Sequence, residues 1–237
     1  MKAVSTVLVT AAEGALGRQA ILRFARAGLK VAGSVASAAT RDELSSYLSK
    51  EGVSVPLVPA QLSKEADVRA LFDGVAAHLG GCPEAILNAA GGFEMFPVAE
   101  ATVERVQWLF DANFTSNWLL LKHALPAMVS RGFGRVVLVS AAGTLSPAPA
   151  GMGFYLAAKS ALNRLIESAA AETADKGVRI NGVLPTILDT PRNRADMPRA
   201  DHSKWVPVPA LLDVVAALFS PAFDVVNGAM IRVPGSL

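Results

Sequence analysis

The sequence alternates short, β-rich apolar runs with longer segments whose apolar residues recur at helical spacing. Strands are expected at 7–9, 31–35, 53–58, 85–87, 136–139, 178–184 and 230–233. Helices are expected at about 16–27, 41–49, 64–79, 103–129, 154–174 and 210–219. Because parallel strands must be joined by crossovers, this alternation produces a parallel sheet with helices on both faces. The pattern therefore predicts an α/β fold with a doubly wound, seven-stranded parallel sheet.

Composition narrows the class of protein. The 237 residues fit a single domain spanning 1–237, and 52% hydrophobic against 18% charged residues excludes an intrinsically disordered chain. The 22 Lys and Arg residues against 20 Asp and Glu residues give a net charge of +2, too balanced for a protein that binds nucleic acid by charge. No apolar run approaches the roughly 18 residues of a membrane helix, and no signal peptide is evident. We expect a cytoplasmic protein with neither a nucleic-acid nor a membrane partner.

The single cysteine, Cys82, cannot form an intrachain disulfide. His78, His123 and His202 are scattered and show no metal-ligand spacing with it. No metal is therefore expected.

One segment, 190–209, interrupts the alternation with four prolines in a polar stretch. A loop of this length inside a compact domain is usually a lid or a binding element. We expect a substrate-binding loop or lid within the single domain, with an ordered surface crossover as the equal alternative.

The turn between the first strand and the first helix reads Thr10-Ala-Ala-Glu-Gly14-Ala-Leu16-Gly17. Backbone amides and the helix dipole at such a turn can receive a pyrophosphate, and Gly14 and Gly17 permit close approach. Alanines, however, occupy the part where the GxGxxG pattern has its first glycine. A tight connection without a ligand is the alternative interpretation.

Tyr155 and Lys159 carry the strongest local signal, because a spacing of i to i+4 places both side chains on one helical face. A tyrosine with its ordinary pKa of about 10 exchanges its proton poorly near neutrality. An exposed pair supplies only about 0.2 to 0.5 kcal/mol, so proton transfer requires a desolvated pocket in which the lysine and an oxidised nicotinamide favour the phenolate. An accidental amphipathic helix is the alternative.

Two further polar residues stand where chemistry is expected. Ser140 follows an expected strand, at the edge where open α/β sheets bind ligands, and could hold a carbonyl oxygen. Asn113 is a poor helix former inside an expected helix. Turn capping by Ser140 and a backbone-bonded Asn113 are the alternatives.

Together these residues resemble the short-chain dehydrogenase/reductase family, from Val7 to about Val233. The family's catalytic tetrad is matched by Asn113, Ser140, Tyr155 and Lys159, and its NAG element is similar to Asn88-Ala89-Ala90-Gly91. The resemblance implies a Rossmann-type fold and an NAD(P)(H)-dependent oxidoreductase that transfers hydride between nicotinamide and a carbonyl or hydroxyl substrate.

The resemblance also implies residue roles. Tyr155 would act as acid and base, Ser140 would orient the acceptor, and Asn113 would position a proton-relay water. Lys159 would bind the nicotinamide ribose and lower the pKa of Tyr155. The implied cofactor-binding residues are Thr10, Gly14, Leu16, Gly17, Ser34, Arg41, Gln61, Leu62, Asn88, Ala89, Gly91, Tyr155, Lys159, Pro185 and Thr190. The expected substrate-binding residues are Phe93, Met152, Met197 and Trp205.

The second strand ends Ser34-Val35-Ala36, without the acidic residue that normally binds the ribose hydroxyls of NAD. Ser34, Ser37, Thr40 and Arg41 could meet a 2′-phosphate. The sequence therefore favours NADP(H), with NAD(H) left open, unless Arg41 only begins a solvated helix.

Two alternative functions remain. The segments 14–17 and 188–205 are similar to dihydropteridine reductases within the family, which makes a quinonoid dihydropteridine reductase-like enzyme one alternative. The alanines of the first turn leave a noncatalytic nucleotide-binding scaffold as the other. Aromatic residues at helical spacing favour a homodimer or homotetramer, as in the family: Trp108, Phe110, Phe114 and Trp118. The substrate itself is not specified by the sequence.

Overall fold

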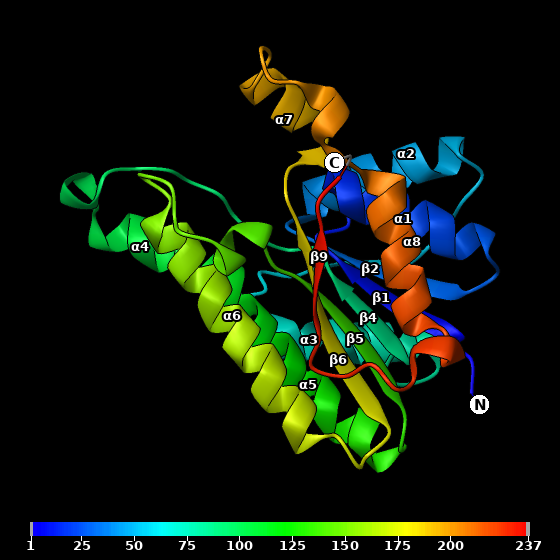
Figure 1. Cartoon of the computed structure of the whole chain (residues 1–237). Helices are drawn as coiled ribbons and strands as arrows, with labels where there is room; N and C mark the ends of the chain where they lie inside the picture. Colours follow the sequence, from blue (N-terminus) through cyan, green and yellow to red (C-terminus); the bar gives the residue numbers. More distant parts are fainter. Residues whose placement is uncertain (1, 236–237) are drawn as a thin grey trace.

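The computed structural model describes residues 2–235 and contains one seven-stranded, fully parallel sheet with the order β3-β2-β1-β4-β5-β6-β9 (Figure 1). The strands of this sheet are β1 (Thr6–Thr10), β2 (Lys30–Val35), β3 (Leu57–Pro59), β4 (Ala85–Asn88), β5 (Gly134–Val139), β6 (Val178–Pro185) and β9 (Met230–Val233). The predicted doubly wound α/β fold is confirmed. Its β-rich apolar runs form strands because residues buried on both faces of a parallel sheet must be apolar throughout.

Helices cover both faces of the sheet (Figure 1). Their bounds are α1 (Ala15–Arg26), α2 (Ala38–Lys50), α3 (Glu65–Leu79), α4 (Val103–Phe110), α5 (Ser116–Ser130), α6 (Gly153–Glu172), α7 (Pro191–Asp196) and α8 (Val208–Phe219). One core lies between the sheet and α1, α2 and α8, and the second lies between the sheet and α3, α5 and α6. Alternate residues of one strand serve the two cores: Val7 and Val9 face one, and Leu8 faces the other.

The structure divides the single helix expected at 103–129. A π-helical turn at Asp111–Thr115 separates α4 from α5. The side chain of Asn113 lies within this turn and donates to the carbonyl oxygens of Leu109, at 2.9 Å, and Gly92, at 2.8 Å. Turns of this kind often accompany functional sites, because they redirect side chains and backbone carbonyls.

The segment 190–209 is ordered. Thr190 caps α7 by accepting a hydrogen bond from the backbone N–H of Asn193 at 3.2 Å. Two short strands, β7 (Leu188–Asp189) and β8 (Val206–Pro207), pair at the base of the segment. The segment stands above the carboxyl ends of the main strands (Figure 1). The segment is thus an ordered connection beside the expected binding edge. Its role as a substrate-binding loop or lid stays a prediction.

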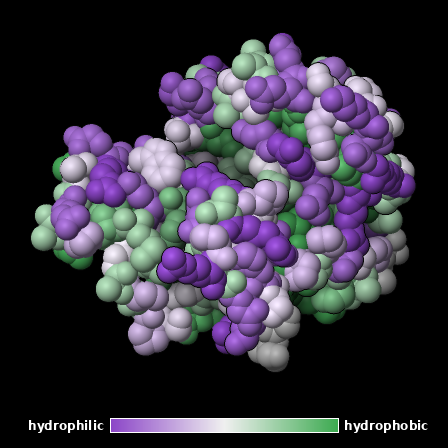
Figure 2. All heavy atoms as spheres, turned by 90° about the horizontal axis from the view of Figure 1, so that it is seen from above, coloured by the Kyte–Doolittle hydropathy of each residue, from purple (hydrophilic) through white to green (hydrophobic). Residues whose placement is uncertain are grey.

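Strand order locates the ligand-binding edge. The chain moves outward from β1 to β2 and β3, and then returns to β4 on the other side of β1. Ligands of open α/β sheets bind outside the carboxyl ends of the strands at such a reversal. Viewed from above, this edge of the molecule is hollowed, with hydrophobic atoms within the hollow and hydrophilic atoms around it (Figure 2).

Candidate active site

The turn between β1 and α1 brings backbone atoms unusually close together. A side chain at Gly17 would place its Cβ 2.4 Å from the carbonyl oxygen of Ala11, so only glycine fits there. Ala11 itself has a φ of +46°, a left-handed conformation usually taken by glycine. Gly14, the N-cap of α1, supplies no side-chain cap, so the first-turn amides of this helix point toward the hollow edge without a side-chain acceptor. This cradle fits the pyrophosphate of a dinucleotide.

Tyr155 and Lys159 lie one turn apart on α6, as expected. The Lys159 side chain is buried, and its Nζ donates to the carbonyl oxygen of Val139 at 2.7 Å. The Tyr155 ring packs edge to face on Phe93, with 5.0 Å between ring centroids. Burial raises the pKa of Tyr155 to about 12 and lowers the pKa of Lys159 to about 8. Both side chains are thus largely shielded from bulk water.

Gly91 links the tetrad residues that lie on different elements. A Cβ at Gly91 would lie 3.0 Å from Asn113 Oδ1 and 3.3 Å from Lys159 Nζ. The Asn113 side chain also accepts from the Gly92 backbone N–H at 3.2 Å. Asn113 and Lys159 thus converge on the loop that follows β4, and the absence of a side chain at Gly91 permits their approach.

Ser140 follows β5 and is 3% exposed. Its hydroxyl donates to Asn163 Oδ1 at 2.6 Å, while Asn163 Nδ2 donates to the Thr144 hydroxyl at 2.9 Å. Because the Thr144 hydroxyl donates to the carbonyl oxygen of Ala141, the Asn163 amide keeps its oxygen toward Ser140. Sequence analysis missed Asn163, although its position four residues after Lys159 places it on the same face of α6.

A second buried polar chain supports the β4 edge. Thr10 Oγ1 donates to Asn88 Oδ1, Asn88 Nδ2 donates to Asn117 Oδ1 at 2.7 Å, and Asn117 Nδ2 donates to the carbonyl oxygen of Asn113 at 2.9 Å. Thr10 and Asn88 are both fully buried within this series of hydrogen bonds. The structure therefore gives both residues a bracing role between β1, β4 and α5, and Asn117 extends that role beyond the residues expected from the sequence.

Of the groups expected to meet a 2′-phosphate, Ser34 is buried, and Ser37, Thr40 and Arg41 hold other partners. Ser34 is 1% exposed within β2, and Ser37 caps α2 by accepting from the backbone N–H of Thr40 at 3.2 Å. The Arg41 Nε donates to its neighbour Asp42 at 2.9 Å. These contacts agree with the alternative in which Arg41 belongs to a solvated helix.

The remaining expected cofactor residues lie along the same edge. Leu16 is buried in α1, and the exposed Gln61 donates its backbone N–H to Asp67 at 3.0 Å. Leu62 is half-buried against the second core, and Pro185 ends β6. Ala89 is half-buried against the first core, beside β4. Their contacts with a cofactor stay predictions.

The expected substrate residues fall into two groups. Phe93, 53% exposed, lies against Tyr155, and half-buried Met152 is the N-cap of α6, two residues before Phe154. Met197 and Trp205 lie in the segment 190–209. Trp205 is only 5% exposed, with its ring 4.3 Å from that of His202, so packing accounts for it.

Sequence analysis did not anticipate an aromatic stack near the first group. The rings of Phe96 and Phe154 stack with centroids 5.4 Å apart, and the Arg105 guanidinium lies 3.9 Å from the Phe96 centroid. The Phe96 backbone N–H donates to the carbonyl oxygen of Gly151 at 3.0 Å. These contacts hold the loop after β4 against the start of α6 and thereby position Phe93.

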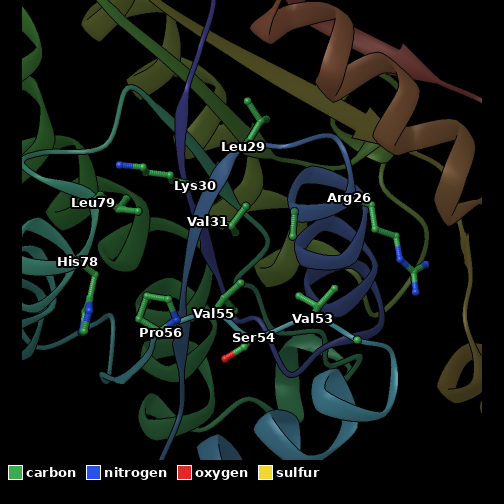
Figure 3. A pocket seen from close by; sticks show the side chains of 12 residues that line it. Arg26, Leu29, Lys30, Val31, Val53, Ser54, Val55, Pro56, His78 and Leu79 are labelled. Atoms are coloured by element: carbon green, nitrogen blue, oxygen red, sulfur yellow. The ribbon is translucent and has the colours of Figure 1, made fainter.

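Two hollows lie at the opposite, amino edge of the sheet. The larger, about 500 Å³, is bounded by α1, β2, the loop before β3 and the end of α3. Its basic side chains, Arg26, Lys30 and His78, point in different directions (Figure 3). Arg26 is already paired with Glu51 at 2.8 Å. The groups do not converge on a common point, so this hollow has no chemistry comparable to the site at the carboxyl edge.

Within residues 2–235, no three His, Cys, Asp or Glu side chains form a group able to hold a metal ion. In the same range, no helix is both long enough and apolar enough to cross a membrane.

Comparisons with known proteins found relatives in sequence and in fold. A family model described as short chain dehydrogenase matches residues 5–200. The chain is 30% identical over 188 residues to 2,5-dichloro-2,5-cyclohexadiene-1,4-diol dehydrogenase of Sphingobium indicum, covering 78% of this chain and 73% of that protein. It is 28% identical over 244 residues to glucose 1-dehydrogenase 2 of Bacillus subtilis, covering 98% and 94%. The crystal structure of a gluconate 5-dehydrogenase from Burkholderia cenocepacia, in complex with NADP and tartrate, has the same fold, with a TM-score of 0.87 at 23% identity over 97% of this chain and 93% of that one.

Proposed function

The chain belongs to the short-chain dehydrogenase/reductase family and is an NAD(P)-dependent oxidoreductase. From this premise we propose that it interconverts a carbonyl and a hydroxyl group, with Tyr155 as the proton donor and acceptor. One observation carries the proposal: Tyr155 and Lys159 share a desolvated face of α6, where Lys159 Nζ lies beside Gly91 and bonds to Val139.

The residues at the carboxyl edge fit a nicotinamide dinucleotide. The glycine cradle of the β1–α1 turn would hold the pyrophosphate, and Lys159, next to Gly91, would hold the ribose at the reactive end. When bound, the cofactor supplies or accepts the hydride. The chain's own contribution is to align the substrate, exclude water and manage the proton.

The protonation states suit that task. A pKa of about 12 keeps the Tyr155 phenol protonated at neutral pH, so it can donate to a carbonyl oxygen that gains negative charge. In the reverse direction the phenol must lose its proton, which requires positive charge nearby. Lys159 supplies that charge when protonated, because its backbone partner at Val139 is a neutral acceptor and does not cancel it.

Ser140 would fix the reacting oxygen. Its own proton is directed to Asn163, so in this arrangement the Ser140 oxygen offers lone pairs to the site. Because the single hydroxyl proton of an alcohol substrate goes to Tyr155, Ser140 would donate to the reacting oxygen, which requires its hydroxyl to rotate away from Asn163. Asn113, held by the π-helical turn, would place a water molecule on the route from Lys159 to solvent.

Exposed apolar side chains on the loops after β4 and β5 favour a substrate with an apolar or ring-shaped body, and one of them, Phe93, contacts Tyr155. Phe93, Met95 and Leu145 are each more than half exposed. The dichlorocyclohexadiene diol dehydrogenase named above acts on a ring-shaped diol, which supports this choice by analogy. A quinonoid dihydropterin is also a flat ring, so the dihydropteridine reductase-like alternative stays a prediction that the same screen tests. The noncatalytic scaffold is disfavoured, because Asn113 and Lys159 both approach Gly91 and Tyr155 lies one helical turn from Lys159.

Three finer predictions accompany this function. A preference for NADP(H), favoured by the sequence, depends on Ser34, Ser37, Thr40 and Arg41, of which the last three hold other partners in the structure. A homodimer or homotetramer is supported by Trp108 and Trp118, which are 48% and 44% exposed. Light scattering at micromolar concentration checks this, and a monomer would contradict it. The cytoplasmic location expected from the sequence stays a prediction.

The function is tested by following nicotinamide absorbance with NADH and NADPH against cyclic ketones, aldehydes and a quinonoid dihydropterin. An active substrate is then used with the Tyr155→Phe variant. We expect turnover to fall by about 100-fold or more while the dissociation constant of the dinucleotide stays unchanged, because the phenol hydroxyl acts on the proton. The matched control is Tyr47→Phe, which removes the chain's other phenol hydroxyl and should leave turnover unchanged. Full turnover by Tyr155→Phe would contradict the assignment.

A further inference from the structure

Glu13 occupies an unusual place in the β1–α1 turn. Its Oε1 accepts a hydrogen bond from the backbone N–H of Ala36 at 3.0 Å, and Ala36 directly follows β2. In dinucleotide-binding folds, an acidic residue near the end of the second strand, about 20 residues beyond the glycine turn, accepts from the 2′-hydroxyl of the adenosine ribose. This chain has no acidic residue in β2 or at Ala36. Glu13 therefore brings a carboxylate to the same place from the neighbouring element.

The second oxygen of this carboxylate is the feature that points to a ligand. Glu13 Oε2 is buried, and within residues 2–235 it has no hydrogen-bond partner. A buried carboxylate oxygen without a donor is costly and rare in folded proteins, and an absent hydrogen-bond donor would account for it. The adenosine ribose of NAD(H) carries two hydroxyl donors that could satisfy it. NADP(H) instead places a phosphate of charge about −1.5 to −2 at the 2′ position, which offers acceptors and repels the carboxylate.

The nearby cations do not neutralise Glu13. The Arg18 guanidinium donates to the main-chain oxygen of Glu13, at 2.6 and 3.2 Å, and lies over the Tyr47 ring. Arg41 is paired with Asp42. Neither arginine is bonded to the Glu13 side chain.

We propose that Glu13 selects NAD(H) over NADP(H) in this chain by replacing the acidic residue that β2 lacks. This proposal rests on the proposed function, because it requires the dinucleotide to bind at the carboxyl edge. It reverses the preference for NADP(H) expected from the sequence, because that expectation depended on Ser34 and Arg41 and did not include Glu13.

The test measures binding alone and needs no substrate. NADH and NADPH are titrated into the full-length protein, and dissociation constants are taken from nicotinamide fluorescence. We expect NADH to bind at least about tenfold more tightly than NADPH. In Glu13→Gln, NADPH should gain affinity and NADH should lose it, so that the ratio falls by about tenfold or more. Exposed Glu43 on α2 gives the matched control, because Glu43→Gln removes the same charge and should leave the ratio unchanged.

A second measurement uses the unaltered protein, so it does not depend on how the variant folds. Raising the salt concentration from about 0.05 to 0.5 M should strengthen NADPH binding relative to NADH, since salt screens the repulsion between two anions. The proposal is overturned if NADPH binds as tightly as NADH, or if Glu13→Gln changes the ratio no more than Glu43→Gln. If neither dinucleotide binds, the proposed function fails, and this proposal fails with it.

Discussion

Replacing Ala11 with glycine should stabilise the protein. Ala11 is the one described residue other than glycine that has a positive φ, at +46°. A Cβ in this left-handed region costs about 1 to 2 kcal/mol. Glycine removes that cost but adds about 0.4 to 1 kcal/mol of conformational entropy to the unfolded chain. The net gain should therefore be about 0.5 to 1 kcal/mol, which in a domain of this size raises Tm by about 1 to 4 °C.

The matched control is Ala12→Gly. Ala12 adjoins Ala11 but lacks a positive φ, and it is fully buried in the core beneath β1 and α1. Its replacement loses a buried methyl group and adds the same chain entropy, so it should destabilise the protein by about 1 kcal/mol or more. Urea unfolding without dinucleotide measures both variants. If Ala11→Gly destabilises the protein as Ala12→Gly does, then the left-handed conformation of Ala11 does not lower the free energy of unfolding, and the reasoning is refuted.

Three further predictions concern buried polar groups. Lys159→Met should raise the free energy of unfolding at pH 7 by up to about 3 kcal/mol, because burial lowers the Lys159 pKa from 10.5 to about 8. This gain should shrink as pH rises from about 8 to 10.5, where the lysine of the unfolded chain also loses its proton. Urea titrations at several pH values measure it. Glu84→Gln should cost about 1 to 3 kcal/mol. Burial raises the Glu84 pKa, but bonds from Lys2 and Ser5 outweigh it and lower the pKa to about 2, so the cost should disappear as acid unfolding is followed from pH 4.5 toward 2. Asn163→Leu should lower turnover about three- to tenfold, because Ser140 loses the hydrogen bond that fixes its position. Asn163→Asp, which can still accept from Ser140, should restore turnover, and dinucleotide affinity should stay unchanged in both variants, as steady-state kinetics and fluorescence titration would show.

The strands could be predicted because burial on both faces demands uninterrupted apolar runs. The expected strand at 230–233 matches β9, and those at 7–9 and 31–35 lie within β1 and β2. The run at 53–58 was the exception, since the strand there covers only Leu57–Pro59. Val53 is buried in the first core without belonging to a strand. The hydrophobicity of a residue therefore did not show whether it packs in the core from a loop or pairs within the sheet.

The helix at 103–129 shows a different limit. Its apolar spacing continues through 111–115, so the period indicated one helix. The π-helical turn depends instead on bonds from Asn113 to Gly92 and from Asn117 to Asn113, one of which reaches a loop 21 residues away. Long-range hydrogen bonds of this kind leave no periodic signal in the sequence.

Tyr155 and Lys159 could be singled out because their spacing is local, and Ser140 because it follows a strand, whereas the contact between Glu13 and Ala36 could not be predicted. The significance of Glu13 depends on the distance between the β1–α1 turn and Ala36, which only the pairing of β1 with β2 determines. The same pairing explains why the end of β2 can do without an acidic residue. A ribose hydroxyl needs a carboxylate at one point in space, and either of two adjacent strand ends can deliver it. For folds of this type, a missing acidic residue after the second strand is therefore weak evidence for NADP(H) until the side chains of the first turn have been placed.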